Sequence, residues 1–96
     1  MIISKDIIYF NSEPRLYELE KSGKKSNTLR LMNSDESDLF DYNKYIIKYI
    51  TICESNTQPV NKFTRTLTNI CDVSFIFMEL ICGTTAHIFS WNSEEK

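Results

Sequence analysis

Apolar and polar residues alternate with different periods along the chain, and each period predicts a different element. The opening segment, Met1–Phe10, becomes apolar on both faces at Ile7–Phe10, which is typical of a buried strand. Between Phe63 and Thr68 every second residue is a threonine, and this period of two predicts a second strand. Ala86–Trp91 predicts a last strand.

Two further segments are rich in large apolar residues. Tyr45–Cys53 carries them on both faces, so it predicts a central strand of a sheet. Val73–Ile81 is apolar almost throughout, and periodicity alone fits either a strand or a buried helix. We favour mostly strand, because Phe75–Phe77 lies just ahead of a turn at Gly83.

One segment has the start and stop signals of a helix. Ser12 can cap the N-terminus of Glu13–Ser22. Pro14 lies in the first turn, where its missing N–H is not needed, and Gly23 follows the last turn. The apolar side of this helix is expected to comprise Leu16, Tyr17 and Leu19. A later acidic cluster predicts a solvated loop or the start of a short helix, and consists of Asp35, Glu36, Asp38 and Asp41.

The order of these elements, strand, helix and then five strands, predicts an α+β fold. The sheet is expected to form a small β-barrel or a strongly curved mixed sheet with one early helix. The abundance of isoleucine, aromatic residues and threonine favours sheet, and the single alanine argues against a helical bundle. A length of 96 residues has room for one domain, spanning residues 1–96.

The net charge of −2 and the pI near 5.3 exclude a protein that coats nucleic-acid phosphates, although local contact with a nucleic acid stays open. One histidine and three scattered cysteines make no convincing zinc site, so we expect neither a metal nor another cofactor. No 18-residue apolar run and no signal-peptide layout occur. The sequence therefore predicts no membrane partner and a cytoplasmic protein, in a cell or carried by a phage.

Positive charge is concentrated where the predicted helix ends and a strand begins. Between Lys21 and Arg30 there are four cations and no acid. Ammonium, guanidinium, hydroxyl and amide groups at such a junction can hold an anionic or carbonyl-rich ligand. A solvated basic loop after a helix C-terminus is the alternative interpretation. The candidate ligand-binding residues of this segment are Lys24, Ser26, Asn27 and Arg30.

The same segment carries a resemblance to a known family. Gly-Lys-Lys-Ser-Asn-Thr-Leu-Arg at Gly23–Arg30 resembles the signature G-[RK]-K-[ST]-x-T-x-R of ASCH domains, which belong to the PUA-like superfamily. A helix precedes it, and a strand ending in Ile8-Tyr9-Phe10 precedes the helix, so the layout agrees across about Ile2–Leu31. The resemblance implies a small β-barrel with a cleft at this junction that binds RNA, a nucleotide or a modified nucleoside.

One branch of that family, the bacterial acetylcytidine amidohydrolases, is similar in size and removes an acyl group from a cytidine base. The resemblance implies that Thr28 is a nucleophile and Lys25 its base. No segment here matches the family's catalytic glutamate. Glu79, the only acid in its apolar run, is the candidate to replace it, and Glu54 is a weaker one. An outward-facing strand residue is the alternative interpretation of Glu79.

Three aromatic residues and one histidine remain to be assigned. Tyr9, Phe10 and Trp91 could stack on a nucleobase, or they could simply belong to the core. His87 has no partner at a recognisable spacing, which predicts a packed or surface residue rather than a catalytic base.

Three functions follow from the sequence. The first is binding of RNA or a modified nucleoside, and the second is hydrolysis of an acylated nucleobase. The third is a non-enzymatic, phage-type protein that acts by binding a host protein, which the acidic pI and the acidic cluster favour.

Overall fold

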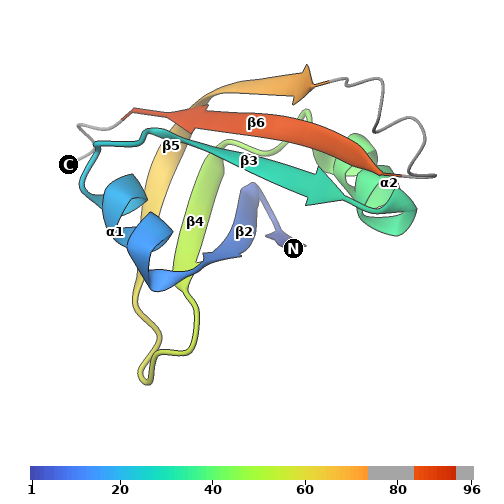
Figure 1. The fold of residues 1–96 in the computed structure, drawn as a ribbon. Helices are drawn as coiled ribbons and strands as arrows, with labels where there is room; N and C mark the ends of the chain where they lie inside the picture. The colour runs from blue at the N-terminus through green and yellow to red at the C-terminus, as the bar shows by residue number, and fades with distance from the viewer. Residues whose placement is uncertain (74–83, 93–96) are drawn as a thin grey trace.

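The computed structural model describes residues 1–73 and 84–92, and these residues form six strands and two helices (Figure 1). In chain order the elements are β1 (Ile2–Ser4), β2 (Ile7–Ser12), α1 (Pro14–Lys21), β3 (Asn27–Met32), α2 (Ser34–Asn43), β4 (Tyr49–Glu54), β5 (Lys62–Val73) and β6 (Thr85–Trp91). Neither helix of the described chain has the length and apolar content needed to cross a membrane.

The strands form one mixed sheet in the order β1-β2-β4-β5-β6-β3. β2 and β4 run parallel, and the other neighbouring strands are antiparallel. Within the described residues no strand pairing joins the edge strands β1 and β3, so the sheet is not closed into a barrel. The predicted α+β class is confirmed. Of the two forms expected for the sheet, the closed barrel is wrong and an open mixed sheet is found.

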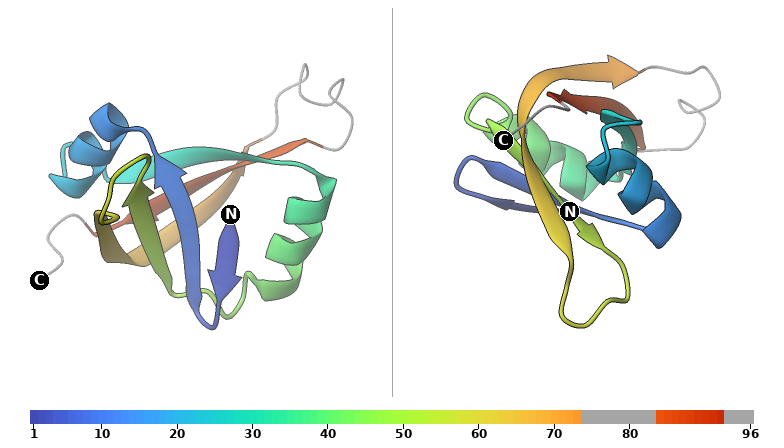
Figure 2. Two further views of the ribbon diagram at one scale, coloured as in Figure 1. Left: turned by 90° about the horizontal axis from the view of Figure 1, so that it is seen from below. Right: turned by 90° about the vertical axis from the view of Figure 1, so that its left-hand side faces the viewer.

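The long strand β5 connects the two halves of this sheet. Residues 62–66 pair with β4 and residues 67–73 pair with β6, with a register shift between Leu67 and Asn69. An irregularity of this kind increases the local twist of a strand. Figure 2 shows β5 bending strongly, so that β6 and β3 fold back across β4 and β2. The free edge of β3 thereby approaches the end of β2.

Helix α1 begins and ends close to the predicted positions, but its cap and its buried side differ. The Glu13 carboxylate, rather than Ser12, accepts the first backbone N–H groups, from Leu16 at 3.0 Å and Arg15 at 3.3 Å. Leu16 is exposed, so the predicted apolar side is wrong there. The residues of α1 that are buried are Tyr17 and Glu20.

The prediction of a single early helix is also wrong, because the acidic cluster forms a second helix, α2. A capping box starts it: the Asn33 side chain accepts from the Glu36 backbone, and the Glu36 carboxylate accepts from the Asn33 backbone. Acidic residues in the first turn complement the helix dipole. Phe40 anchors the helix in the core.

The remaining strands differ from their predicted bounds by a few residues. A turn with Lys5 at φ 55° divides the opening segment into β1 and β2. β4 begins at Tyr49 instead of Tyr45, whereas β5 confirms the threonine-rich strand and extends it to Val73. β6 confirms the last strand. Residues 74–81 of the predicted strand and the turn at Gly83 lie outside the described residues.

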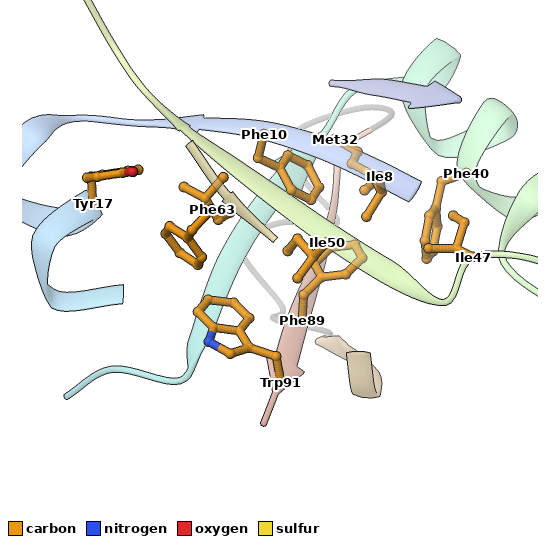
Figure 3. Packing of buried hydrophobic residues seen from close by; sticks show 11 residues of the cluster. Ile8, Phe10, Tyr17, Met32, Phe40, Ile47, Ile50, Phe63, Phe89 and Trp91 are labelled. Atoms are coloured by element: carbon orange, nitrogen blue, oxygen red, sulfur yellow. The ribbon is translucent and has the colours of Figure 1, made fainter. Parts of the chain in front are cut away.

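The core lies between the two halves of the bent sheet (Figure 3). Ile8 and Phe10 alternate inward from β2, opposite Phe89 and Trp91 of β6. The Phe10 and Phe89 rings lie 5.0 Å apart between centroids. Because this packing holds β2 against β6 and its neighbour β3, it fixes the place where the end of β2 meets β3.

Candidate functional site

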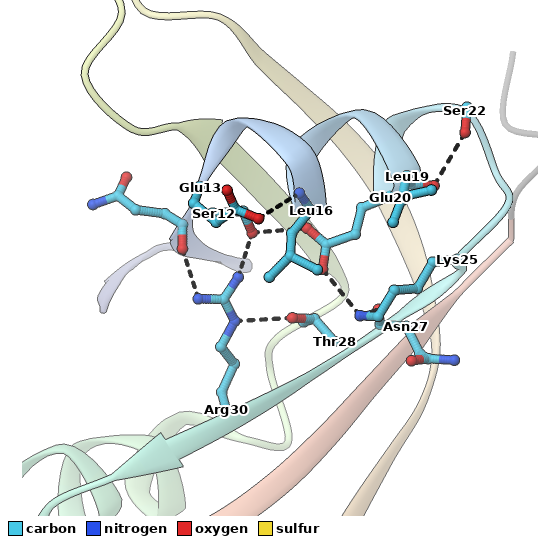
Figure 4. A network of polar contacts seen from close by, with 11 residues as sticks. Ser12, Glu13, Leu16, Leu19, Glu20, Ser22, Lys25, Asn27, Thr28 and Arg30 are labelled. Carbon is cyan, nitrogen blue, oxygen red and sulfur yellow. Dashed lines mark hydrogen bonds and ion pairs between the residues drawn. The ribbon is translucent and has the colours of Figure 1, made fainter.

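The candidate site lies where three elements meet: the end of β2, helix α1 and the start of β3 (Figure 4). The chain leaves α1 through Gly23, whose φ of 85° is strongly disfavoured for a residue with a Cβ. The Lys25 N–H then donates to the Leu19 carbonyl at 3.0 Å, which fixes the turn. This turn sends β3 back past the end of β2 and brings the cationic segment beside α1.

Arg30 is the centre of the polar network. Its Nη1 donates to the Asn11 carbonyl and its Nη2 to the Ser12 hydroxyl, both at 2.6 Å. Its Nε donates to Thr28 Oγ1 at 3.0 Å. Its guanidinium lies over the Phe10 ring, 4.8 Å from the centroid. One side chain thus bridges β2 and β3, which share no ladder.

Two features of the surroundings of Arg30 have opposite effects on the pKa of its guanidinium. Burial lowers the pKa of the Arg30 guanidinium from its ordinary value, and the Glu20 carboxylate acts against that change. Glu20 itself is 1% exposed. Its Oε1 accepts from Ser12 Oγ at 2.7 Å, so a single hydroxyl links the guanidinium to the carboxylate.

Lys25 completes the network from the other side of Glu20. Its Nζ lies 3.3 Å from Glu20 Oε2 and donates to the Asn27 carbonyl at 2.6 Å. The cluster therefore holds two cations, Lys25 and Arg30, against one carboxylate. Because Lys25 is partly exposed, this surplus positive charge lies where solvent can reach it.

The structure brings three of the predicted site residues together, namely Lys25, Thr28 and Arg30. Thr28 is buried, at 3% exposure, and Lys25 and Arg30 are partly buried. Three others of the segment contribute no side chain to the network. The Ser26 hydroxyl donates to the Gly23 carbonyl at 3.3 Å, and the side chains of Lys24 and Asn27 are exposed. Glu79 lies outside the described residues.

Tyr9 and Phe10 line one pocket of about 350 Å³, together with Met1, Ile2, Ser4, Asn11 and Cys53. The pocket adjoins the polar network, because Phe10 lies under the Arg30 guanidinium and the Asn11 carbonyl accepts from it. Phe10 is 6% exposed and belongs to the core, whereas Tyr9 is half-buried. Phe10 therefore belongs to the core, as one of the two sequence interpretations had it, and Tyr9 is the more exposed ring of the two.

Sequence reasoning missed two members of the network, Ser12 and Glu20. Ser12 continues the inward alternation of Ile8 and Phe10 along β2. Glu20 lies three residues after the buried Tyr17, on the same side of α1. Both signals were present in the sequence, but polar residues on a buried stripe are easily assigned to solvent.

His87 is packed, one of the two outcomes that the sequence predicted, and it has two hydrogen-bonding partners that spacing along the chain did not indicate. Its Nδ1 lies 2.7 Å from Asp72 Oδ1, and its Nε2 lies 3.2 Å from Thr85 Oγ1. Asp72 is the cross-strand partner of His87 in the β5–β6 ladder, a relationship that spacing along the chain does not reveal.

Among residues 1–73 and 84–92, no three histidine, cysteine or carboxylate side chains gather as a metal ion requires. No family model, curated protein or solved structure matches the chain.

Proposed function

We propose that this protein is a small binding module that holds a nucleoside, a nucleotide or RNA at the junction of β2, α1 and β3. The observation that carries the proposal is the charge of the network, in which Lys25 and Arg30 share the single carboxylate of Glu20. A site with surplus positive charge and fixed N–H donors favours a phosphate or a carbonyl-rich base.

The neighbouring pocket supports a nucleoside as the ligand. Its volume, about 350 Å³, lies in the range of small-molecule sites. The half-buried Tyr9 ring provides a face on which a base can stack. The Asn11 side chain, which also lines the pocket, offers an amide for the edge of the base.

The resemblance to ASCH domains agrees with this proposal at the same residues. The helix, the glycine turn and the strand that carries Lys25, Thr28 and Arg30 follow one another in the expected order. The finer fold assignment, to a PUA-like domain, is part of the proposal.

Amide hydrolysis is a second candidate, because a buried acid does lie beside Lys25. Glu20 supplies the carboxylate for which Glu79 was the sequence candidate. The hydrogen bonds nevertheless favour binding. Lys25 Nζ donates to Glu20 and to the Asn27 carbonyl, while Thr28 Oγ1 accepts from Arg30. A nucleophile and its base would instead share a hydrogen bond.

Titration calorimetry with ribonucleosides, nucleoside monophosphates, acetylcytidine and a short single-stranded RNA tests the proposal. Lys25→Ala is expected to weaken binding at least tenfold, because it removes the accessible cation of the network. Lys24→Ala is the matched control, since the neighbouring lysine is exposed and lies outside the network. Equal affinity of the Lys25→Ala variant and the control would reject this site.

The same samples separate binding from hydrolysis. Acetylcytidine that is bound but recovered intact after long incubation supports the binding module. Release of acetate that depends on both Lys25 and Thr28 would instead establish the amidohydrolase.

A further inference from the structure

A second polar cluster lies at the opposite end of the sheet from α1, where β5, β6 and α2 meet. It contains Asp72 of β5, Thr85 and His87 of β6, and Ser37 of α2. The cluster uses none of the side chains of the Arg30 network, although His87 lies directly opposite Arg30 in the β3–β6 ladder. The β5–β6 ladder places Asp72 directly opposite His87, so the sheet itself sets their distance.

The contact with Asp72 requires a proton on one nitrogen of the His87 imidazole. A carboxylate can only accept, so the Nδ1 that lies 2.7 Å from Asp72 Oδ1 carries the proton. In the neutral ring Nε2 then has a free lone pair, and Thr85 Oγ1 lies 3.2 Å from it. The hydroxyl, the imidazole and the carboxylate are therefore in the order and at the spacing that activate an alcohol for nucleophilic attack.

The surroundings hold this arrangement in place. His87 is 5% exposed, and its ring packs against Phe40 of α2 with 4.8 Å between centroids. Thr85 is half-buried, so part of its surface is open to solvent. Thr85 Oγ1 donates to Ser37 Oγ at 3.3 Å, so its proton turns from Ser37 to His87 Nε2, 3.2 Å away, when the hydroxyl reacts.

We propose that Thr85, His87 and Asp72 form a catalytic hydroxyl–imidazole–carboxylate triad that cleaves small neutral or cationic carboxylic esters. The charge preference follows from the exposed acidic side chains that flank Ser37 in α2, Asp35 and Asp38, since Glu36 is paired with the N-terminal ammonium. These carboxylates disfavour an anionic substrate. This activity is separate from the proposed nucleoside site, which has surplus positive charge.

The reaction proceeds in two steps, acylation of Thr85 and its hydrolysis. Thr85 Oγ1 forms a bond to the ester carbonyl carbon while its proton moves to His87 Nε2. The carbon–oxygen bond to the alcohol then breaks, and the alcohol leaves with that proton, so that the acyl group remains on Thr85. A water molecule then gives a proton to Nε2 and its oxygen bonds to the acyl carbon. The bond between that carbon and Thr85 Oγ1 breaks, and Nε2 returns the proton to Oγ1, which releases the carboxylic acid and restores the Thr85 hydroxyl.

The test uses the full chain with 4-nitrophenyl acetate, a neutral ester, and 4-nitrophenyl hydrogen succinate, an anionic one. We expect nitrophenol release with the acyl group mapped to Thr85 by mass spectrometry, and a slower reaction with the anionic ester. Thr85→Val, which keeps the shape and removes the hydroxyl, is expected to lower the acetate rate at least tenfold. Thr85→Ser should retain activity. Thr64→Val, in the exposed part of β5, is the matched control.

Asp72 is a positioning residue in this scheme, and its variant separates catalysis from folding. The Asp72 side chain is 76% exposed, so Asp72→Asn is expected to fold. It should lower the acylation rate without changing the ester concentration that gives half the maximal rate, because it disturbs the imidazole and not the binding of the ester. An unchanged rate in Thr85→Val or Asp72→Asn, or an acyl group found on a residue other than Thr85, would overturn the proposal.

Discussion

Arg30 and Ser12 lie on strands that share no ladder hydrogen bond, yet the guanidinium Nη2 donates to the Ser12 hydroxyl at 2.6 Å. The same side chain reaches the Asn11 carbonyl, so it joins the free edge of β3 to the end of β2. No strand ladder joins β3 to β2 in this open sheet, and the Arg30 side chain connects them instead. Stability and the proposed ligand site therefore depend on the same residue.

The contribution of Arg30 to stability can be measured directly. Arg30→Lys keeps the charge but cannot place three donors at Asn11, Ser12 and Thr28 together. We expect the free energy of unfolding to fall by about 1–3 kcal/mol in urea denaturation. Arg15→Lys, at an exposed position, is the control and should change it by less than about 0.5 kcal/mol. Equal effects of the two variants would contradict the bridging role.

We expect Glu20 to stabilise the fold through the charge of its carboxylate rather than through the packing of its side chain. Glu20→Gln keeps the size of the side chain but leaves Lys25 and Arg30 without a carboxylate. Because Glu20 is buried, we expect a loss of about 1–3 kcal/mol in the free energy of unfolding. Glu18→Gln, at an exposed position of the same helix, provides the comparison. A loss as small as that of Glu18→Gln would show that the carboxylate is not needed there.

A third prediction concerns Glu13, the N-cap residue of α1. Glu13→Ala removes the carboxylate that accepts from the Leu16 and Arg15 backbones, and should cost about 1 kcal/mol of stability. Thermal unfolding followed by circular dichroism measures this loss. Glu13→Asp, which retains a carboxylate, should recover part of it. If Glu13→Ala is as stable as the wild type, the cap assignment is wrong.

The buried hydroxyl of Tyr17 should make the free energy of unfolding depend on pH in the alkaline range. Its hydroxyl is buried, with no hydrogen-bond partner among the described residues, and burial, followed by the charges of Glu54 and Glu18, raises the pKa of the phenol. The unfolded chain therefore loses this proton more readily than the folded one. The stability linked to Tyr17 is complete below the unfolded value of about 10 and falls as the pH rises above it.

Tyr17→Phe removes this linkage and the unpaired hydroxyl. We expect the variant to be as stable as the wild type at neutral pH, or more stable by up to about 1 kcal/mol. Above pH 10 its stability should decline less steeply than that of the wild type in urea denaturation. Tyr42→Phe, at a side chain that is 89% exposed, should decline as the wild type does. Parallel curves for Tyr17→Phe and the wild type would refute the linkage.

Local signals in the sequence identified several elements because their causes lie within a few residues. Pro14 and Gly23 set the limits of α1, since proline fits a first helical turn and glycine accepts a positive φ. The alternation along Phe63–Thr68 predicted β5 from the period of a strand. The helix α2 was underestimated because its acidic residues were assigned to solvent, although Asn33 and Glu36 have the spacing of a capping box.

The sequence also located the cationic segment between Lys21 and Arg30, because charge density can be read from composition alone. It could not show that Glu20 turns inward toward Lys25 and Ser12. That contact depends on which side of α1 the bent sheet covers. Burial is a property of the assembled fold, and the charge balance of the site changes with it.

The sequence by itself determined the α+β class, the limits of α1 and the position of the positive charge, because each follows from interactions between near neighbours. The tertiary structure decided which polar groups meet. The β5–β6 register placed Asp72 beside His87 across 15 residues of chain, and the bend of β5 brought Arg30 to Ser12. Both contacts depend on strand pairing and core packing over the whole sheet, and no local pattern encodes either of them.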